Sequence, residues 1–346
     1  MSESRERDGV KAFVVSAPGE SSVQEVEAPV ATAGEVVVDV ARVGVCGTDV
    51  EFFTGEMAYL HDGKAAYPMR LGHEWCGVVV ATGRGVEESW IGRRVAGDTM
   101  LGCGQCERCR SGRQHLCERR TEVGISGGQA GALAEQLAVP ASSLRSLPDT
   151  VDDVAGAMVE PGGNALRAFW AAELSARERA LVLGPGTIGL LVALFAKAAG
   201  VEVHVMGKDE PSLSFARSLG LEGVWTLEDL PRLAFDAVID ASNAAALPAL
   251  ALDLVEPGKR VVYIGLAGTP STVDTRTIAL KDVTAVGILS GSPGLVGAIE
   301  AYASGSVDPR PLVAATVGLE RVGDVLAGWR PSDAGAGPKI HVDPRI

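Results

Sequence analysis

Six cysteines are the first residues of this sequence that could do chemistry, and four of them lie close together. These four are spaced as C-x2-C-x2-C-x7-C, at Cys103, Cys106, Cys109 and Cys117. Four thiolates can close a tetrahedral zinc site, and clustered thiols in a reducing compartment are more often metal ligands than disulfides. Because protein sulfur would fill every position, we expect a structural zinc, with an iron–sulfur cluster as the alternative.

A second candidate metal site combines different ligand types. Cys46 opens the turn-like stretch Cys46-Gly47-Thr48-Asp49, and His73 and Glu74 follow further along the chain. A thiolate, an imidazole and a carboxylate suit zinc with one position left for water or substrate. Spacing alone does not distinguish this site from packed core residues. We interpret the sixth cysteine, Cys76, as a small buried apolar residue.

A glycine-rich hexamer in the second half of the chain predicts a nucleotide site. The stretch Gly184-Pro185-Gly186-Thr187-Ile188-Gly189 matches G-x-G-x-x-G directly after an apolar strand and directly before a helix. In that context, backbone N–H groups and the helix N-terminus can bind a pyrophosphate. The sequence therefore predicts a dinucleotide cofactor.

The residues after the next strand bear on the choice between NAD and NADP. A carboxylate there would bind the ribose 2′-hydroxyl of NAD, but Gly207 occupies the expected position. Lys208 could accept the 2′-phosphate of NADP, whereas Asp209 keeps NAD open. The pattern favours NADP; both charges could equally be solvated loop residues.

The elements that must position these residues change in type along the chain. From about residue 10 to 148, short β-type runs such as 36–40 and 77–81 are separated by Gly and Pro. From about 152 to 290, apolar strands alternate with Ala- and Leu-rich helices, which is typical of βαβ units and a parallel sheet. The expected strands are 181–183, 201–206, 236–240, 260–265 and 283–288. Helices are expected to start near Gly186, Pro211 and Asn243 and to cover 294–304.

Taken together and in this order, these motifs resemble the zinc-containing medium-chain dehydrogenase/reductase family over essentially the whole chain. The resemblance implies an α/β protein with a GroES-like β-rich catalytic domain and a Rossmann domain with a doubly wound parallel sheet. An active-site cleft would lie between them. We expect the catalytic domain at 1–155, with a C-terminal return at 295–346, and the Rossmann domain at 156–294.

The same resemblance implies roles for individual residues. Cys46 and His73 would be ligands of a catalytic zinc, and Glu74 and Glu160 would compete for the third protein position. Glu160 stands in a Glu-Pro pair that resembles the polyol, sugar and threonine dehydrogenase branch.

Three further residues lie close to Cys46 in the sequence. Thr48 matches the hydroxyl that relays the substrate proton, and Asp49 matches a carboxylate that orients the liganding histidine. Glu51 replaces the relay histidine of many alcohol dehydrogenases. It could extend the proton path, contact a polar substrate, or be a solvated loop residue.

The predicted activity is hydride transfer between NAD(P) and a secondary alcohol or ketone, with two zinc ions per chain, one catalytic and one structural. Acidic side chains near the metal favour a polyol, sugar, cyclitol or amino alcohol. The motifs are similar to those of sorbitol, threonine and 2-deoxy-scyllo-inosamine dehydrogenases. Two alternatives remain: an inactive relative acting as a binding or structural protein, and a thiol redox sensor.

Composition restricts the partners and the compartment. The 346 residues carry a net charge of −13, which disfavours nucleic acid and anionic membranes as partners. The polar first residues lack the apolar core of a signal peptide, so we expect a cytoplasmic enzyme. The family resemblance implies a homodimer or homotetramer that binds a small polar alcohol or ketone.

Overall fold

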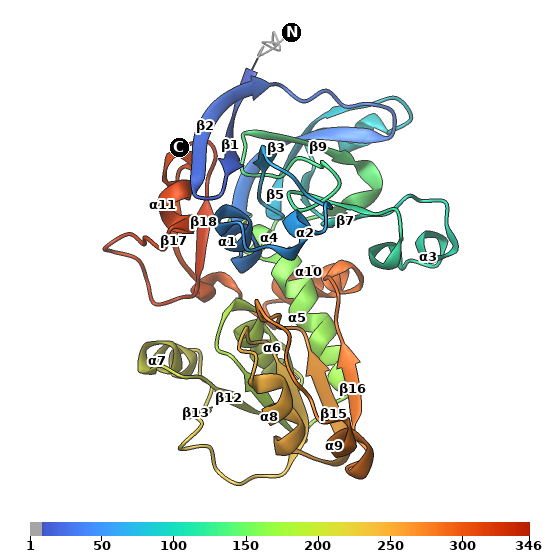
Figure 1. Ribbon diagram of the computed structural model, residues 1–346. Coiled ribbons are helices and arrows are strands. Elements are labelled where there is room, and N and C mark those ends of the chain that lie inside the picture. Colours follow the sequence, from blue (N-terminus) through green and yellow to red (C-terminus); the bar gives the residue numbers. More distant parts are fainter. Residues whose placement is uncertain (1–8) are drawn as a thin grey trace. The chain divides into compact units, whose positions relative to one another are not determined.

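The computed structural model describes residues 9–346, which form two compact units (Figure 1). Unit 1 contains the chain up to residue 160 together with residues 315–335 and 339–346. Unit 2 contains residues 161–314 and 336–338. Within the described residues, no helix has the length and apolar character needed to cross a membrane.

Unit 1 is built mainly from antiparallel strands. The strands of its larger sheet are β3 (Glu35–Gly44), β5 (Glu74–Thr82), β6 (Arg94–Gly97), β9 (Gln136–Pro140), β10 (Leu144–Ser146), β17 (Val313–Val317) and β18 (Lys339–Val342). The remaining strands are β1 (Gly9–Ala17), β2 (Glu20–Glu27), β4 (Met69–Arg70), β7 (Met100–Leu101) and β8 (Thr121–Glu122). Its helices are α1 (Gly47–Thr54), α2 (Ala58–His61), α3 (Glu107–Arg110), α4 (Asp153–Ala157) and α11 (Val322–Leu326).

The larger sheet of unit 1 has the order β10-β6-β5-β3-β18-β17, and β9 also pairs with β3. Valine-rich β3 lies in the middle of this sheet, where β-branched side chains pack well. The predicted β-runs 36–40 and 77–81 are confirmed as parts of β3 and β5. The C-terminal strand β18 pairs directly with β3, so the end of the chain completes the sheet of the N-terminal half.

Unit 2 is a parallel sheet with helices. Its strands are β11 (Arg179–Leu183), β12 (Glu202–Met206), β13 (Gly223–Trp225), β14 (Phe235–Asp240), β15 (Val255–Tyr263) and β16 (Thr284–Gly287). Its helices are α6 (Thr187–Ala198), α7 (Glu210–Ser218), α8 (Leu247–Leu254), α9 (Thr275–Leu280) and α10 (Leu295–Ser304). Helix α5 (Val159–Ala172) crosses the boundary between the two units.

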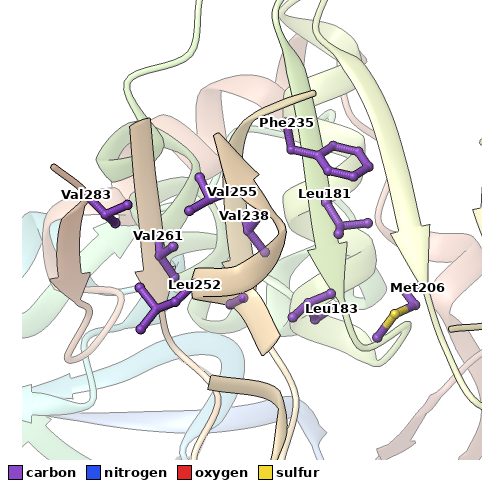
Figure 2. Packing of buried hydrophobic residues seen from close by; sticks show 10 residues of the cluster. Leu181, Leu183, Met206, Phe235, Val238, Leu252, Val255, Val261 and Val283 are labelled. Carbon is purple, nitrogen blue, oxygen red and sulfur yellow. The ribbon is translucent and has the colours of Figure 1, made fainter. Parts of the chain in front are cut away.

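The strand order of unit 2, β13-β12-β11-β14-β15-β16, is that of a doubly wound Rossmann sheet. Apolar side chains from neighbouring strands and from α8 pack into one core, shown in Figure 2. Leu181, Val238 and Val261 are completely buried there. Burying each such side chain contributes about 1.5–3 kcal/mol, so the sheet gives the nucleotide loops a rigid base.

Most elements predicted for the second half are confirmed, but two have other bounds, and β13, α5 and α9 were not predicted. Strand β15 begins at Val255 rather than at 260, because Val255 already pairs with Phe235 of β14. Helix α8 begins at Leu247, not near Asn243, because the backbone only starts to turn at 245.

The helix predicted at 294–304 is confirmed as α10, but it belongs to unit 2 rather than to the C-terminal return. Its Tyr302 stacks on Phe195 of α6, with ring centroids 6.3 Å apart. This apolar contact between α6 and α10 is one reason why α10 packs in unit 2. The return to unit 1 starts at residue 315 instead of 295.

Candidate active site and metal centres

Cys46, His73 and Glu74 come together where β3 ends and β5 begins. Gly44, the last residue of β3, pairs with Glu74, the first residue of β5. Cys46 lies two residues after this pair and precedes α1, while His73 lies one residue before it. One ligand atom from each of Cys46, His73 and Glu74 lies within 4.8 Å of the other two. The sheet register therefore positions all three side chains.

The buried carboxylate of Asp49 ties the two turns of this site together. Its Oδ2 accepts the backbone N–H of Cys46 at 2.8 Å, and its Oδ1 accepts that of Gly72 at 3.2 Å. Oδ1 also lies 3.6 Å from Nδ1 of His73. Burial disfavours the charged imidazole, but the Asp49 carboxylate and Cys46 outweigh it and raise the pKa of His73 well above its usual value. Asp49 thus contacts the turns that carry Cys46 and His73, and its role in orienting the two candidate ligands stays a prediction.

A zinc ion fits this group by the chemistry of its donors. The thiol of Cys46 is half-buried, whereas His73 and Glu74 are buried. One sulfur, one nitrogen and one carboxylate oxygen form a three-ligand set that leaves a fourth tetrahedral position open.

Lys339 is part of this site and was missed in the sequence. Its Nζ donates to both carboxylate oxygens of Glu74, at 2.8 and 2.6 Å, and to the carbonyl oxygen of Val45 at 2.9 Å. Gly44 leaves room for this pair, because a Cβ there would lie 2.1 Å from Oε2 of Glu74. Lys339 comes from β18, 265 residues beyond Glu74, so no local pattern indicated it. The buried ammonium group of Lys339 therefore balances the negative charge of the Glu74 carboxylate.

The other predicted residues of this site lie on two helices. Thr48 and Glu51 belong to α1, and both are half-buried. Burial, followed by repulsion from Glu56, raises the pKa of Glu51. Glu160 lies in the first turn of α5 and is not part of the group formed by Cys46, His73 and Glu74.

The four cysteines of the array also converge. Their ligand atoms all lie within 4.8 Å of one another, and all four are free thiols. The Sγ atoms are 4.0 Å apart between Cys103 and Cys109 and 3.8 Å apart between Cys106 and Cys117. Zn–S bonds of about 2.3 Å in a tetrahedron place sulfurs about 3.8 Å apart, so the spacing fits a closed zinc site.

The surroundings of Cys103 favour its thiolate form. Backbone N–H groups of Gln105 and Cys106 lower the pKa of Cys103 to about 6. Arg119 also donates from Nη2 to its Sγ at 3.2 Å. Donors directed at a sulfur stabilise the deprotonated ligand that a metal needs.

In unit 2, the glycine-rich hexamer forms the turn between β11 and α6. Gly186 immediately precedes α6, and a Cβ there would meet nothing within 4 Å. A Cβ on Gly189 would lie 1.9 Å from the carbonyl oxygen of Gly184, so the turn requires glycine there. The open space at the N-terminus of α6 fits a pyrophosphate.

The residues after β12 lie beside this turn. A Cβ on Gly207 would lie 2.7 Å from Cγ of Pro185, which leaves little room for the acid that NAD enzymes carry there. Lys208 is exposed. Asp209 caps α7, because its Oδ1 accepts the backbone N–H of Ser212 at 3.0 Å.

Comparison with known proteins agrees with both units. Residues 32–149 match the family described as the alcohol dehydrogenase GroES-like domain, and residues 187–304 match the family described as zinc-binding dehydrogenase. Among curated relatives, the 2-dehydro-3-deoxy-L-galactonate 5-dehydrogenase of Pseudoalteromonas atlantica is 33% identical over 85% of this chain and 88% of its own length. The L-threonine 3-dehydrogenase of Sinorhizobium medicae is 28% identical over 90% of this chain and 93% of its own.

Solved structures extend the likeness to the cofactor. The E. coli CFT073 alcohol dehydrogenase RspB, solved with NADH, is 26% identical with a TM-score of 0.89, covering 97% of this chain and 100% of its own. A protein of Sinorhizobium meliloti described as a zinc-binding dehydrogenase, bound to NADP, is 26% identical with a TM-score of 0.87, covering 98% and 100%. The chain belongs to the zinc-type medium-chain dehydrogenase/reductase family and is a nicotinamide-dependent oxidoreductase of secondary alcohols.

Proposed function

We propose that this enzyme oxidises a secondary alcohol that carries further polar groups: a polyol, sugar, cyclitol or amino alcohol. The observation that carries the proposal is the convergence of Cys46, His73 and Glu74 within 4.8 Å around the buried Asp49. Unit 1 would supply this catalytic site and unit 2 the cofactor site. The four-cysteine array would hold a second, structural zinc.

Each residue of the site has a distinct task in this proposal. When bound, the catalytic zinc supplies Lewis acidity that lowers the pKa of the substrate hydroxyl. Cys46 and His73 are its fixed protein ligands, and Asp49 keeps them in place. Glu74 or Glu160 would be the third protein ligand, and Glu74 is the one that lies with Cys46 and His73. The Thr48 hydroxyl accepts the alcohol proton and passes it outward.

Two observations support a polar substrate. Glu51 is a half-buried carboxyl on the same helix as Thr48, so it could bind a substrate hydroxyl or ammonium group. The two curated relatives are named for a sugar acid and for threonine, which both present a secondary alcohol beside other polar groups. A simple alkanol would leave Glu51 without such a partner.

We propose NADP as the preferred cofactor, because Lys208 is exposed beside Gly207 and could pair with the 2′-phosphate. We also propose a cytoplasmic homodimer or homotetramer. An exposed strand edge supports self-association: β16 is the last strand of its sheet, and Leu280 of the preceding helix is 86% exposed.

The test is metal content per chain, measured together with NADP+ and NAD+ reduction over a panel of polyols, sugars, cyclitols, amino alcohols and alkanols. We expect two zinc ions and turnover that is fastest with a polar secondary alcohol and NADP+. One zinc ion without turnover would support the inactive binding protein instead. Reversible disulfide formation with loss of zinc would support the thiol sensor.

A further inference from the structure

Arg167 has no acidic partner among the described residues, although it lies half-buried in unit 2. It is on α5, and its guanidinium donates from Nη1 to the backbone carbonyl oxygen of Leu289 and, at 3.0 Å, to that of Ser290. Burial lowers the pKa of Arg167. One guanidinium nitrogen that donates to two successive backbone carbonyls holds these carbonyls close together and so restrains the course of that backbone.

The segment that Arg167 contacts is the loop after β16, residues 288–294, which we call the β16 loop. Helix α5 touches the β16 loop a second time through glycines. A Cβ on Gly294 would lie 2.2 Å from the carbonyl oxygen of Gly163, and a Cβ on Gly163 would lie 2.7 Å from that of Gly291. Gly163 and Arg167 are four residues apart, so they lie on one face of α5. This face fixes the loop at two points.

The β16 loop has a conformation that needs such support. Ser290 adopts a φ of +72°, which is unfavourable for a residue with a side chain. Its Oγ accepts the backbone N–H of Ser292 at 3.1 Å and lies 2.9 Å from the Ser292 hydroxyl. Arg167 donates to the carbonyl oxygen of Ser290 itself. It therefore supports the residue of the loop whose backbone conformation is unfavourable.

The position of the β16 loop in the sheet relates it to the cofactor. Dinucleotides bind at the carboxyl ends of Rossmann strands, across the point where the strand order reverses, here between β11 and β14. The residues placed to meet the adenosine ribose follow β12, on one side of that point. Strands β14, β15 and β16 lie on the other side of that point, which is the half of a Rossmann sheet that would take the nicotinamide mononucleotide. Figure 1 labels β15 and β16. The β16 loop lies on the nicotinamide side.

We propose that Arg167 is a positioning residue for the nicotinamide half of the cofactor. By binding the Leu289 and Ser290 carbonyls it sets the shape of the β16 loop, and thereby the surface on which the nicotinamide rests. The adenosine half and the pyrophosphate depend on the residues after β12 and on the turn between β11 and α6, whereas the printed bonds of Arg167 go to the β16 loop. The two halves of the cofactor therefore respond differently to loss of this side chain.

The experiment compares binding of the reduced cofactor with binding of ADP-ribose, or of its 2′-phosphate for an NADP enzyme. ADP-ribose retains the adenosine half and the pyrophosphate but lacks nicotinamide. Binding is measured by calorimetry on wild type, Arg167→Met and Arg167→Lys. The lysine keeps the charge but not the reach and planar shape of the guanidinium, so it carries the test if the methionine variant does not fold. Arg260→Met is the matched control, because Arg260 pairs at 2.6 Å with Glu173, just beyond α5, away from the loop.

We expect the Kd of the reduced cofactor to rise about tenfold or more in both Arg167 variants, as for loss of a charged hydrogen bond. The Kd of ADP-ribose should stay within about twofold of wild type, which is the precision needed to separate the two halves. Arg260→Met should change neither. Equal weakening of both ligands, or no weakening of either, would overturn the proposal. Wild-type binding of ADP-ribose tests the nucleotide site itself, separately from Arg167.

Discussion

The two candidate metal-binding clusters of unit 1 differ in how the fold supports them. The four-cysteine array lies on a lobe whose regular structure is one short helix, α3, a 3-10 helix at Gln114–Leu116, and the two-residue strands β7 and β8. The group of Cys46, His73 and Glu74 lies where β3 ends and β5 begins, and these are two inner strands of a seven-stranded sheet. Its supporting Asp49 is fully buried, whereas three of the four lobe cysteines are only partly buried.

This difference indicates what each metal contributes. The lobe has little apolar core, so a closed set of four thiolates must supply its folding energy. The site at Cys46 is positioned by strand pairing, by Asp49 and by Lys339. It can therefore keep one coordination position open for substrate.

The largest expected effect is the loss of one sulfur from the lobe. A structural zinc contributes an apparent binding free energy of about 10 kcal/mol, so Cys106→Ser should unfold residues 103–117 and reduce the zinc content by one ion per chain. Limited proteolysis should then cut the lobe first. If the variant kept both zinc ions and the protease resistance of wild type, the lobe would not depend on its metal for folding, and the difference between the two clusters would be contradicted.

The next effect concerns activity rather than folding. Cys46→Ser should lower kcat/KM by about 10³-fold or more, because Lewis acidity supplies several kcal/mol of barrier reduction. Its melting temperature should change little, since strand pairing positions the site. The matched control is Cys76→Ala, a buried cysteine two residues after Glu74 whose Sγ donates only to the carbonyl oxygen of Asp153, at 3.2 Å. This control should keep both zinc ions and the activity.

Removing the ammonium group of Lys339 tests whether this buried cation stabilises Glu74 in the fold. Lys339→Met leaves the carboxylate of Glu74 buried and unpaired, which should lower the free energy of unfolding by about 3 kcal/mol. Urea denaturation of the metal-free protein measures this loss. The double variant Lys339→Met with Glu74→Gln should recover most of it. If the single and double variants were equally unstable, the loss would come from packing and not from the charge on Glu74.

The contrast between Glu74 and Lys339 also shows the reach of sequence reasoning. The four cysteines, the glycine-rich turn and the strands of unit 2 carry short-range patterns, so their positions could be predicted. Lys339 could not, because its partner lies 265 residues away and a lysine in a strand looks solvated. The short β13 and the late start of α8 were missed for a related reason, since tertiary pairing decides them. The role of Arg167 needed the coordinates of the loop that it binds.

The smallest expected effect comes from Arg119, the lobe's counterpart to Lys339. It donates to Cys103 Sγ but is exposed, so water and salt screen its interaction. Arg119→Met should speed zinc release to a chromogenic chelator by a few-fold, without changing kcat or the melting temperature. Arg113→Met is the matched control, because this exposed arginine donates to Ser111 Oγ and to no cysteine. Equal release rates in the two variants would show that Arg119 does not stabilise the thiolate of Cys103. The backbone N–H groups of Gln105 and Cys106 would then be its remaining donors. A faster rate for Arg119→Met alone would show that each cluster uses a cation beside one ligand, strongly where it is buried and weakly where it is exposed.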